Sequence, residues 1–218
     1  LAAIPTTSPS SEDTENLVHD IRDDVIPGIE DATGAEVLLT GSTASNIDIS
    51  DKLAGALPLF IAMVVGLTML LLLVVFRSIV VPIKAALAIL LSIAASFGVI
   101  VAIFQWGWLK DLVGVEETIP IVSFLPMMMF AILFGLSMDY EVFILSRIRE
   151  EHQRGHSNID SVVEGLGATA KVITAAALIM ISVFLGFVAS DDPVVKMMGV
   201  GLATAVAVDA TIVRMVLL

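Results

Sequence analysis

The 218 residues are too apolar for a water-soluble protein. Hydrophobic residues make up 57% of the chain and charged residues 16%, whereas globular domains carry about a quarter charged residues. The formal net charge of −12 argues against nucleic acid as a partner. The absence of cysteine excludes disulfides and cysteine nucleophiles, and three histidines are a poor basis for a metal site. The composition therefore predicts a membrane protein with no cofactor.

Residues 1–51 hold 11 of the 23 acidic residues, which indicates a water-facing piece before the apolar part of the chain. Leu1–Thr7 and Ala35–Thr40 are predicted strands. Between them, Ser10 or Ser11 begins a helix that ends at Pro27-Gly28. This order is typical of part of an α+β domain, too small to stand alone.

The chain begins without Met, and its last apolar segment is still running at Leu218. We therefore interpret the sequence as a fragment of a longer polypeptide.

After Lys52 the pattern changes to long apolar stretches, each able to cross a hydrocarbon layer that needs about 20 helical residues. The second predicted domain, 52–218, is thus an all-α bundle of five transmembrane helices. Their approximate bounds are 53–76, 85–109, 119–146, 172–190 and 194–218.

The basic residues predict the orientation of this bundle. With the amino-terminal piece outside the cell, seven of them lie on the cytoplasmic side and four outside. The cytoplasmic seven are Arg77, Lys84, Arg147, Arg149, Arg154, Lys171 and Arg214. An odd number of spans then places the carboxy terminus in the cytoplasm.

The long cytoplasmic connection ends in an amphipathic segment. Ser157 and Asp160 form a capping-box pattern, and Val162, Val163 and Leu166 supply an apolar face. The segment either lies along the membrane surface before turning into the fourth span or forms an ordinary solvated loop helix.

Two acids, Asp139 and Asp209, interrupt otherwise apolar helices at comparable depth, roughly 30 Å and 24 Å along their spans at 1.5 Å per residue. Inserting a carboxylate at that depth of the membrane costs about 2.5 kcal/mol of free energy or more. Each acid should therefore face a bundle interior, a partner or water. Either they carry protons, or they are permanently paired groups that lock helix packing.

Neighbouring residues favour a polar site around the two acids. Gly135 lies one turn before Asp139, so a second helix can approach the carboxyl group. Tyr140 offers a hydroxyl that can bond a carboxylate or a water. Arg214 follows Asp209 by five residues, about 140° round an α-helix, which makes it a poor same-helix partner.

A long segment, FGLSMDYEVFILSRIREE from Phe134 to Glu151, resembles the fourth or tenth transmembrane helix of the MMPL family (mycobacterial membrane protein large). This family belongs to the resistance-nodulation-division superfamily of proton-driven exporters. Further similarity lies in VVFRSIVVPIKAALAILLSIAASFG from Val74, TAKVITAAALIM from Thr169 and DATIVRMV from Asp209.

The resemblance implies a carboxy-terminal repeat: the end of an extracytoplasmic porter domain, then five helices. It assigns Asp139 and Tyr140 to a proton relay and extends the role to Asp209 and Arg214. The implied partners are the missing amino-terminal repeat, the bilayer, protons and a lipid or other hydrophobic substrate, in a bacterial inner membrane.

Two other functional classes fit parts of the pattern. A non-transporting lipid- or sterol-sensing module also has five helices and needs no titrating acid in its core. An intramembrane aspartyl protease would use two acids on two helices, but its GxGD signature is missing, because Ala168 follows Gly165-Leu166-Gly167. We therefore expect a proton-motive-force-driven exporter and not an enzyme.

Overall fold

The structure, a computed structural model, describes residues 4–9, 11–115 and 117–217, with side chains as far as Val213. Its contacts divide the chain into two compact units, Leu1–Leu59 and Phe60–Leu218. Helix α3, Ser42–Phe76, runs from the first unit into the second.

The first unit is built on a helical segment made of α1 (Glu12–Asp20), a π-helical turn η1 (Ile21–Val25) and α2 (Ile26–Thr33). Ser11 caps α1 by accepting a hydrogen bond from the Thr14 N–H at 3.3 Å, as predicted. The helix does not end at Pro27. Because proline lacks an N–H and crowds the preceding turn, the wider π turn before it lets the helix continue.

No strand occurs among the described residues of this unit, where residues 4–7 and 35–40 lack regular structure. The first three residues of the first predicted strand lie outside the described residues. A strand needs a partner to satisfy its backbone groups, and none is present for either segment in the described chain. Instead, Glu30 Oε1 accepts a hydrogen bond from the Val37 N–H at 2.8 Å.

A small apolar cluster and one ion pair hold the first unit together. Val18 of α1 packs with Ala44 and Ile47 of α3. Arg22 donates to both carboxylate oxygens of Asp48, at 2.6 and 2.9 Å. This hydrogen bond raises the pKa of Arg22. The core is too small to order a domain alone.

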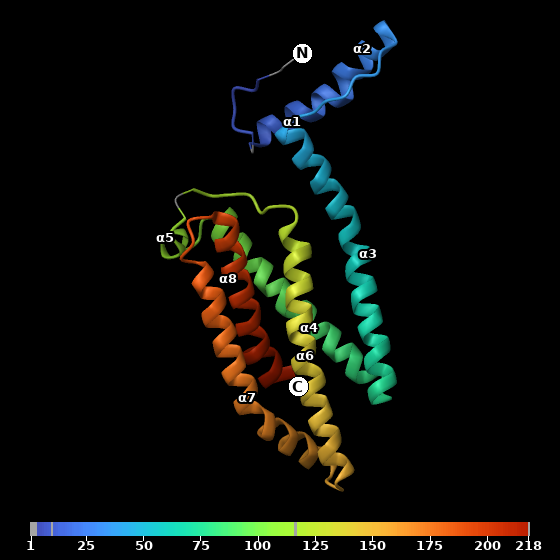
Figure 1. Cartoon of the computed structure of the whole chain (residues 1–218), viewed down its shortest axis with the longest axis vertical. Coiled ribbons are helices and arrows are strands. Elements are labelled where there is room, and N and C mark those ends of the chain that lie inside the picture. Colours follow the sequence, from blue (N-terminus) through green and yellow to red (C-terminus); the bar gives the residue numbers. More distant parts are fainter. Residues whose placement is uncertain (1–3, 10, 116, 218) are drawn as a thin grey trace. The chain divides into compact units, whose positions relative to one another are not determined.

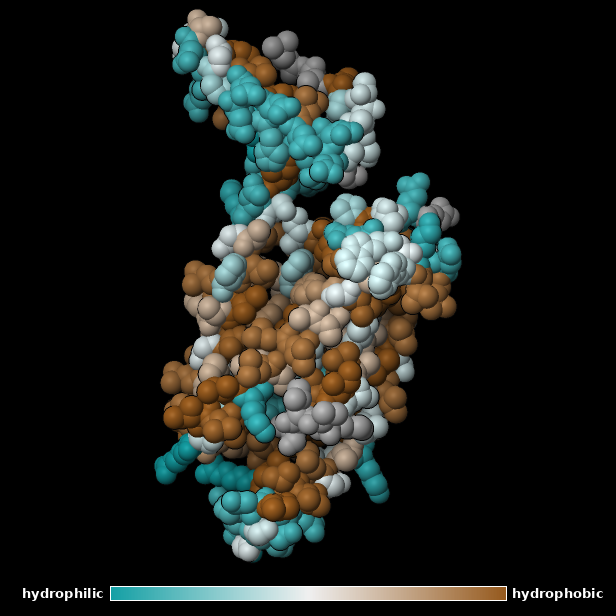
Figure 2. Space-filling view, turned by 180° about the vertical axis from the view of Figure 1, so that it is seen from behind, coloured by the Kyte–Doolittle hydropathy of each residue, from teal (hydrophilic) through white to brown (hydrophobic). Residues whose placement is uncertain are grey.

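The described residues contain five helices that are long and apolar enough to cross a membrane, which confirms the predicted number. They are Ser42–Phe76, Val80–Gln105, Leu125–Gln153, Asn158–Phe187 and Pro193–Val213. The second of these comprises α4 (Val80–Ile100) and η2 (Val101–Gln105), and the last joins α8 (Pro193–Val208) to η3 (Asp209–Leu217). Apolar side chains cover most of the face of the second unit in Figure 2.

The helices extend beyond the apolar stretches of the sequence. Helix α3 begins at Ser42, well before the predicted residue 53, whereas α6 (Leu125–Gln153) begins after the predicted residue 119 and continues past 146. Hydropathy marks the part of a helix that fits the hydrocarbon layer, but backbone hydrogen bonding continues through polar turns.

The predicted amphipathic segment and the fourth span form one helix, α7 (Asn158–Phe187). Ser157 is its N-cap, accepting from the Asp160 N–H at 3.2 Å, as the capping pattern predicted. The first turns of α7 run obliquely to the rest of the helix in Figure 1. Its buried residues recur every fourth position and give one packing face: Ser161, Gly165, Thr169, Ile173 and Ala177.

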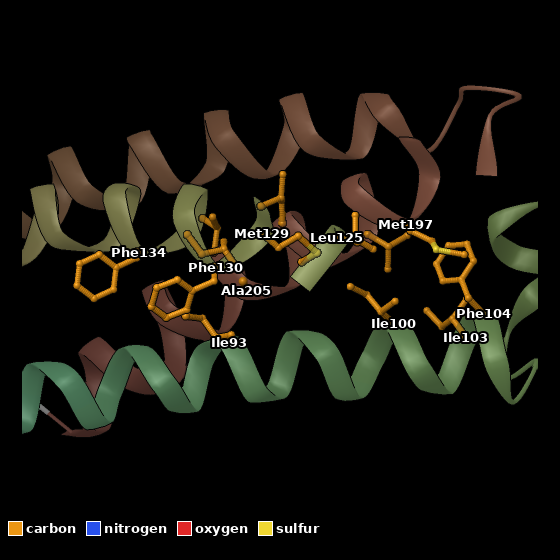
Figure 3. Close-up of a cluster of buried hydrophobic side chains, with 14 of the residues drawn as sticks. Ile93, Ile100, Ile103, Phe104, Leu125, Met129, Phe130, Phe134, Met197 and Ala205 are labelled. Atoms are coloured by element: carbon orange, nitrogen blue, oxygen red, sulfur yellow. The ribbon is translucent and has the colours of Figure 1, made fainter. Parts of the chain in front are cut away.

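The core of the second unit lies between α4, α6 and α8 (Figure 3). Ile100, Met129 and Phe130 are almost fully buried there. Gly201 of α8 faces this core so closely that a Cβ would lie 2.4 Å from Ile100 Cδ1. At the same level Ser96, itself fully buried, donates to the Gly201 carbonyl at 2.6 Å. The absence of a side chain at Gly201 and the hydrogen bond from Ser96 thus allow α4 and α8 to pack closely.

Helices α6 and α7 are in close contact at Gly165, where an added Cβ would lie 2.9 Å from Ile148 Cα. We predict that Gly165→Ala lowers the free energy of unfolding by about 1–3 kcal/mol, because a backbone must move. Gly167→Ala is the control: its Cβ meets nothing within 4 Å, so alanine should be neutral or stabilising. Unfolding of both variants in detergent checks this, and equal stabilities would contradict the packing described.

Candidate functional site

A small, partly open cavity lies between α4, α6, α7 and the α8–η3 helix. Its walls are mostly apolar, contributed by residues such as Ile89, Leu133, Ile173 and Val206. Four side chains with polar groups also line it: Ser92, Ser137, Tyr140 and Asp209. Placing an acid in a mostly apolar cavity costs free energy unless the acid is hydrogen-bonded. The hydrogen-bond partners of Asp209 therefore decide what the cavity can do.

Asp209 is hydrogen-bonded across the cavity. The Ser137 hydroxyl of α6 donates to Asp209 Oδ1 at 3.2 Å. Tyr140, three residues further along α6, lies on the same helical face and donates its hydroxyl to Met180 Sδ at 3.3 Å. The structure thus brings two of the predicted relay residues, Tyr140 and Asp209, to one cavity.

The backbone changes from α to π geometry at Asp209, the first residue of η3. The predicted angle of about 140° between Asp209 and Arg214 assumed an α-helix. In a π-helix the hydrogen bonds join residues five apart, so the two backbone positions are one turn apart. The side chain of Arg214 lies outside the described residues.

Asp139 lies apart from this cavity, on an exposed face of α6. Gly135 is exposed on the same face, and a Cβ there would meet nothing within 4 Å. Ala131 and Phe143 continue the exposed stripe at four-residue spacing. The open space expected beside Asp139 is therefore present, but no helix of the described chain fills it.

Sequence reasoning missed both Ser137 and Glu141, although Glu141 lies only two residues from Asp139. Glu141 and Asp139 face differently, and the face of Glu141 is the buried one: its side chain is 6% exposed, whereas Asp139 is exposed. The spacing of Ser137, Tyr140 and Glu141 at i, i+3 and i+4 was the available signal, since it places all three on one helical face.

Metal chemistry finds no support in the described residues, which contain no group of three or more His, Cys, Asp or Glu side chains able to hold an ion.

Four of the five spans line a cavity with a hydrogen-bonded acid, an arrangement consistent with a multi-span membrane transporter. The MMPL family model matches residues 1–217, and the chain belongs to this family.

Named relatives share much of the sequence. The chain is 42% identical over 218 residues to the membrane protein YdfJ of Bacillus subtilis, covering 100% of this chain and 29% of YdfJ. It is 43% identical over 192 residues to the mycolic acid-containing lipids exporter MmpL11 of Mycolicibacterium smegmatis, covering 88% of this chain and 20% of the exporter. Over 184 residues it is 37% identical to the trehalose monomycolate exporter MmpL3 of Mycobacterium tuberculosis, covering 84% and 19%. The chain thus spans less than a third of the length of these relatives.

The hydrogen bond between Ser137 and Asp209 is open to a direct stability test. Ser137→Ala leaves the carboxyl group without this donor, and we expect a loss of about 1–3 kcal/mol in the free energy of unfolding. Ser182→Ala is the matched control, because that exposed hydroxyl bonds only the Leu178 carbonyl of its own helix in the described structure. Equal effects of the two substitutions in the same unfolding assay would contradict the role of Ser137.

Proposed function

We propose that this chain is the carboxy-terminal repeat of a proton-motive-force-driven exporter of lipids or other hydrophobic molecules. The observation that carries the proposal is the hydrogen-bonded Asp209 in a mostly apolar cavity, with Tyr140 in the same wall. Membership of the MMPL family and the printed names of MmpL11 and MmpL3 support the substrate class.

Protonation of the partly buried Asp209 carboxylate changes both its charge and its hydrogen bonding. Ionised Asp209 accepts a hydrogen bond from the Ser137 hydroxyl, whereas the protonated acid is neutral and can itself donate one. The two forms favour different packing of α6 against η3. A proton that binds from one side and leaves to the other would therefore shift the helices between two arrangements.

Asp139 supports the proposed partner, the amino-terminal repeat of the same transporter. Its carboxylate and the bare surface at Gly135 lie on the same exposed face of a helix long enough to span the membrane. Lipid would be a costly neighbour for that carboxylate, whereas helices of a second repeat would bury it. In our proposal Asp139 and Tyr140 join the relay at this contact, and Asp209 and Arg214 continue it.

The proposal also covers the two ends of the bundle. Residues 1–51 would complete their α+β fold with strands from the rest of a porter domain outside the cell. The carboxy-terminal end of α6 carries the ion pairs of Arg147 and Arg154 with Glu150, which suit the cytoplasmic side of a bacterial plasma membrane.

In the full-length transporter we predict that Asp139→Asn abolishes export, because the amide keeps the shape but cannot carry a proton. Tyr140→Phe should reduce export severely and leave residual activity, since water can replace the hydroxyl. Asp191→Asn, at an exposed loop acid, is the control for expression and insertion. Export from proteoliposomes with an imposed pH gradient is the measurement, and normal export by Asp139→Asn would remove Asp139 from the relay.

Substitutions of Asp209 separate a proton carrier from a packing group. If Asp209 carries protons, Asp209→Glu keeps part of the export and Asp209→Asn loses it. If the residue only locks packing, the order reverses, because asparagine can still bond Ser137 while an extra methylene strains the site. The same export assay, with expression matched, distinguishes the two orders. A tolerated asparagine with an inactive glutamate would refute the proton-carrying role of Asp209.

A further inference from the structure

The segment Trp106–Val113 follows the end of the second span at Gln105 and carries large apolar side chains into the open. Trp106 is 64% exposed, Trp108 63%, Leu109 67% and Leu112 81%. We call residues 106–113 the interfacial loop; it includes the short helix α5 (Lys110–Val113). Nothing in the proposed export mechanism uses it.

The loop has a defined fold. The N–H groups of Trp106 and Trp108 donate to the carbonyls of Val101 and Ala102 at 3.0 and 2.8 Å. The two indole rings lie 5.4 Å apart, centre to centre. Leu109 adopts a φ of +56°, a left-handed conformation that costs free energy for any residue but glycine. The Leu109 side chain is exposed despite this backbone cost, and an apolar environment would stabilise it.

The ammonium group of Lys196 connects the carboxy-terminal end of the loop to α8. Lys196, in the first turn of α8, donates from Nζ to the carbonyls of Gly114 at 2.6 Å and Val113 at 3.3 Å. Gly114 has a φ of +68°, and a Cβ there would lie 3.3 Å from Nζ. The ammonium group therefore fixes where α5 ends.

We propose that the interfacial loop binds the lipid headgroup region at the Gln105 end of the bundle, and that Lys196 positions it there. Tryptophan favours this region because its ring is apolar and its N–H is polar. The loop is continuous with a membrane span, so its apolar side chains meet lipid without any movement of the bundle. Lys110 and Asp111 lie between the apolar residues and suit the wet side of the same boundary.

Fluorescence quenching tests the proposal in the full-length transporter, reconstituted in phosphatidylcholine vesicles. Trp106 and Trp108 are the two tryptophans of this chain, and the difference between the parent and the W106F/W108F variant isolates their emission. We expect lipids brominated near the headgroup to quench this emission more than lipids brominated near the chain end. Acrylamide in the aqueous phase should quench weakly.

The other outcomes overturn the proposal. Strong quenching by acrylamide alone would place the rings in water, and protection from both quenchers would place them against protein.

The role of Lys196 is tested with Lys196→Met, which removes the ammonium group. We expect loss of the preference for shallow bromines in the difference emission, while Lys171→Met, at an exposed lysine of α7, keeps it. Unchanged quenching in Lys196→Met would show that Lys196 does not position the loop. Because neither measurement involves transport, the result stands apart from the proposed export function.

Discussion

The cost of placing a carboxylate inside an apolar layer governs the arrangement of this bundle. The chain meets that cost in two ways. Asp209 lies in the wall of a cavity and accepts a hydrogen bond from Ser137, a partner supplied by another helix of the same bundle. Asp139 lies on the exposed face of α6, where the described chain supplies no covering helix. One acid is accommodated by this fold, and the other lies on an exposed face that, in our proposal, a second repeat covers.

Small residues make the first solution possible. The cavity forms because α6, α7 and α8 converge at close contacts on either side of it, and those contacts depend on residues without long side chains. Gly165 admits the backbone of α6, and Gly201 admits Met129 and Ile100. The hydroxyl of Ser96 then ties α4 to the α8 backbone without adding bulk. Where lipid tails are as apolar as the helices, such packing supplies much of the association free energy.

Local signals in the sequence predicted the features that depend on local chemistry. The five spans follow from hydropathy, and the caps at Ser11 and Ser157 follow from the hydroxyl and acid spacing alone. The features that were missed depend on distant residues. The two expected strands need partners outside the described segments, and the buried side of α6 could not be chosen until its neighbours were known. Either face of α6 carries an acid, Asp139 or Glu141, so composition could not decide which face was internal.

The adjacency of Asp139 and Tyr140 has a geometric consequence for the proposed relay. Consecutive residues of an α-helix lie about 100° apart, so two neighbours can face different sides of the helix. Here Tyr140 lines the cavity that holds Asp209, while Asp139 lies on the exposed face. Helix α6 thus presents one member of the pair to its own bundle and the other outward. In our proposal a small rotation or shift of α6 would change the surroundings of Asp139 and Tyr140 together. Such a movement would couple the cavity to the second repeat, as a proton relay between two repeats requires.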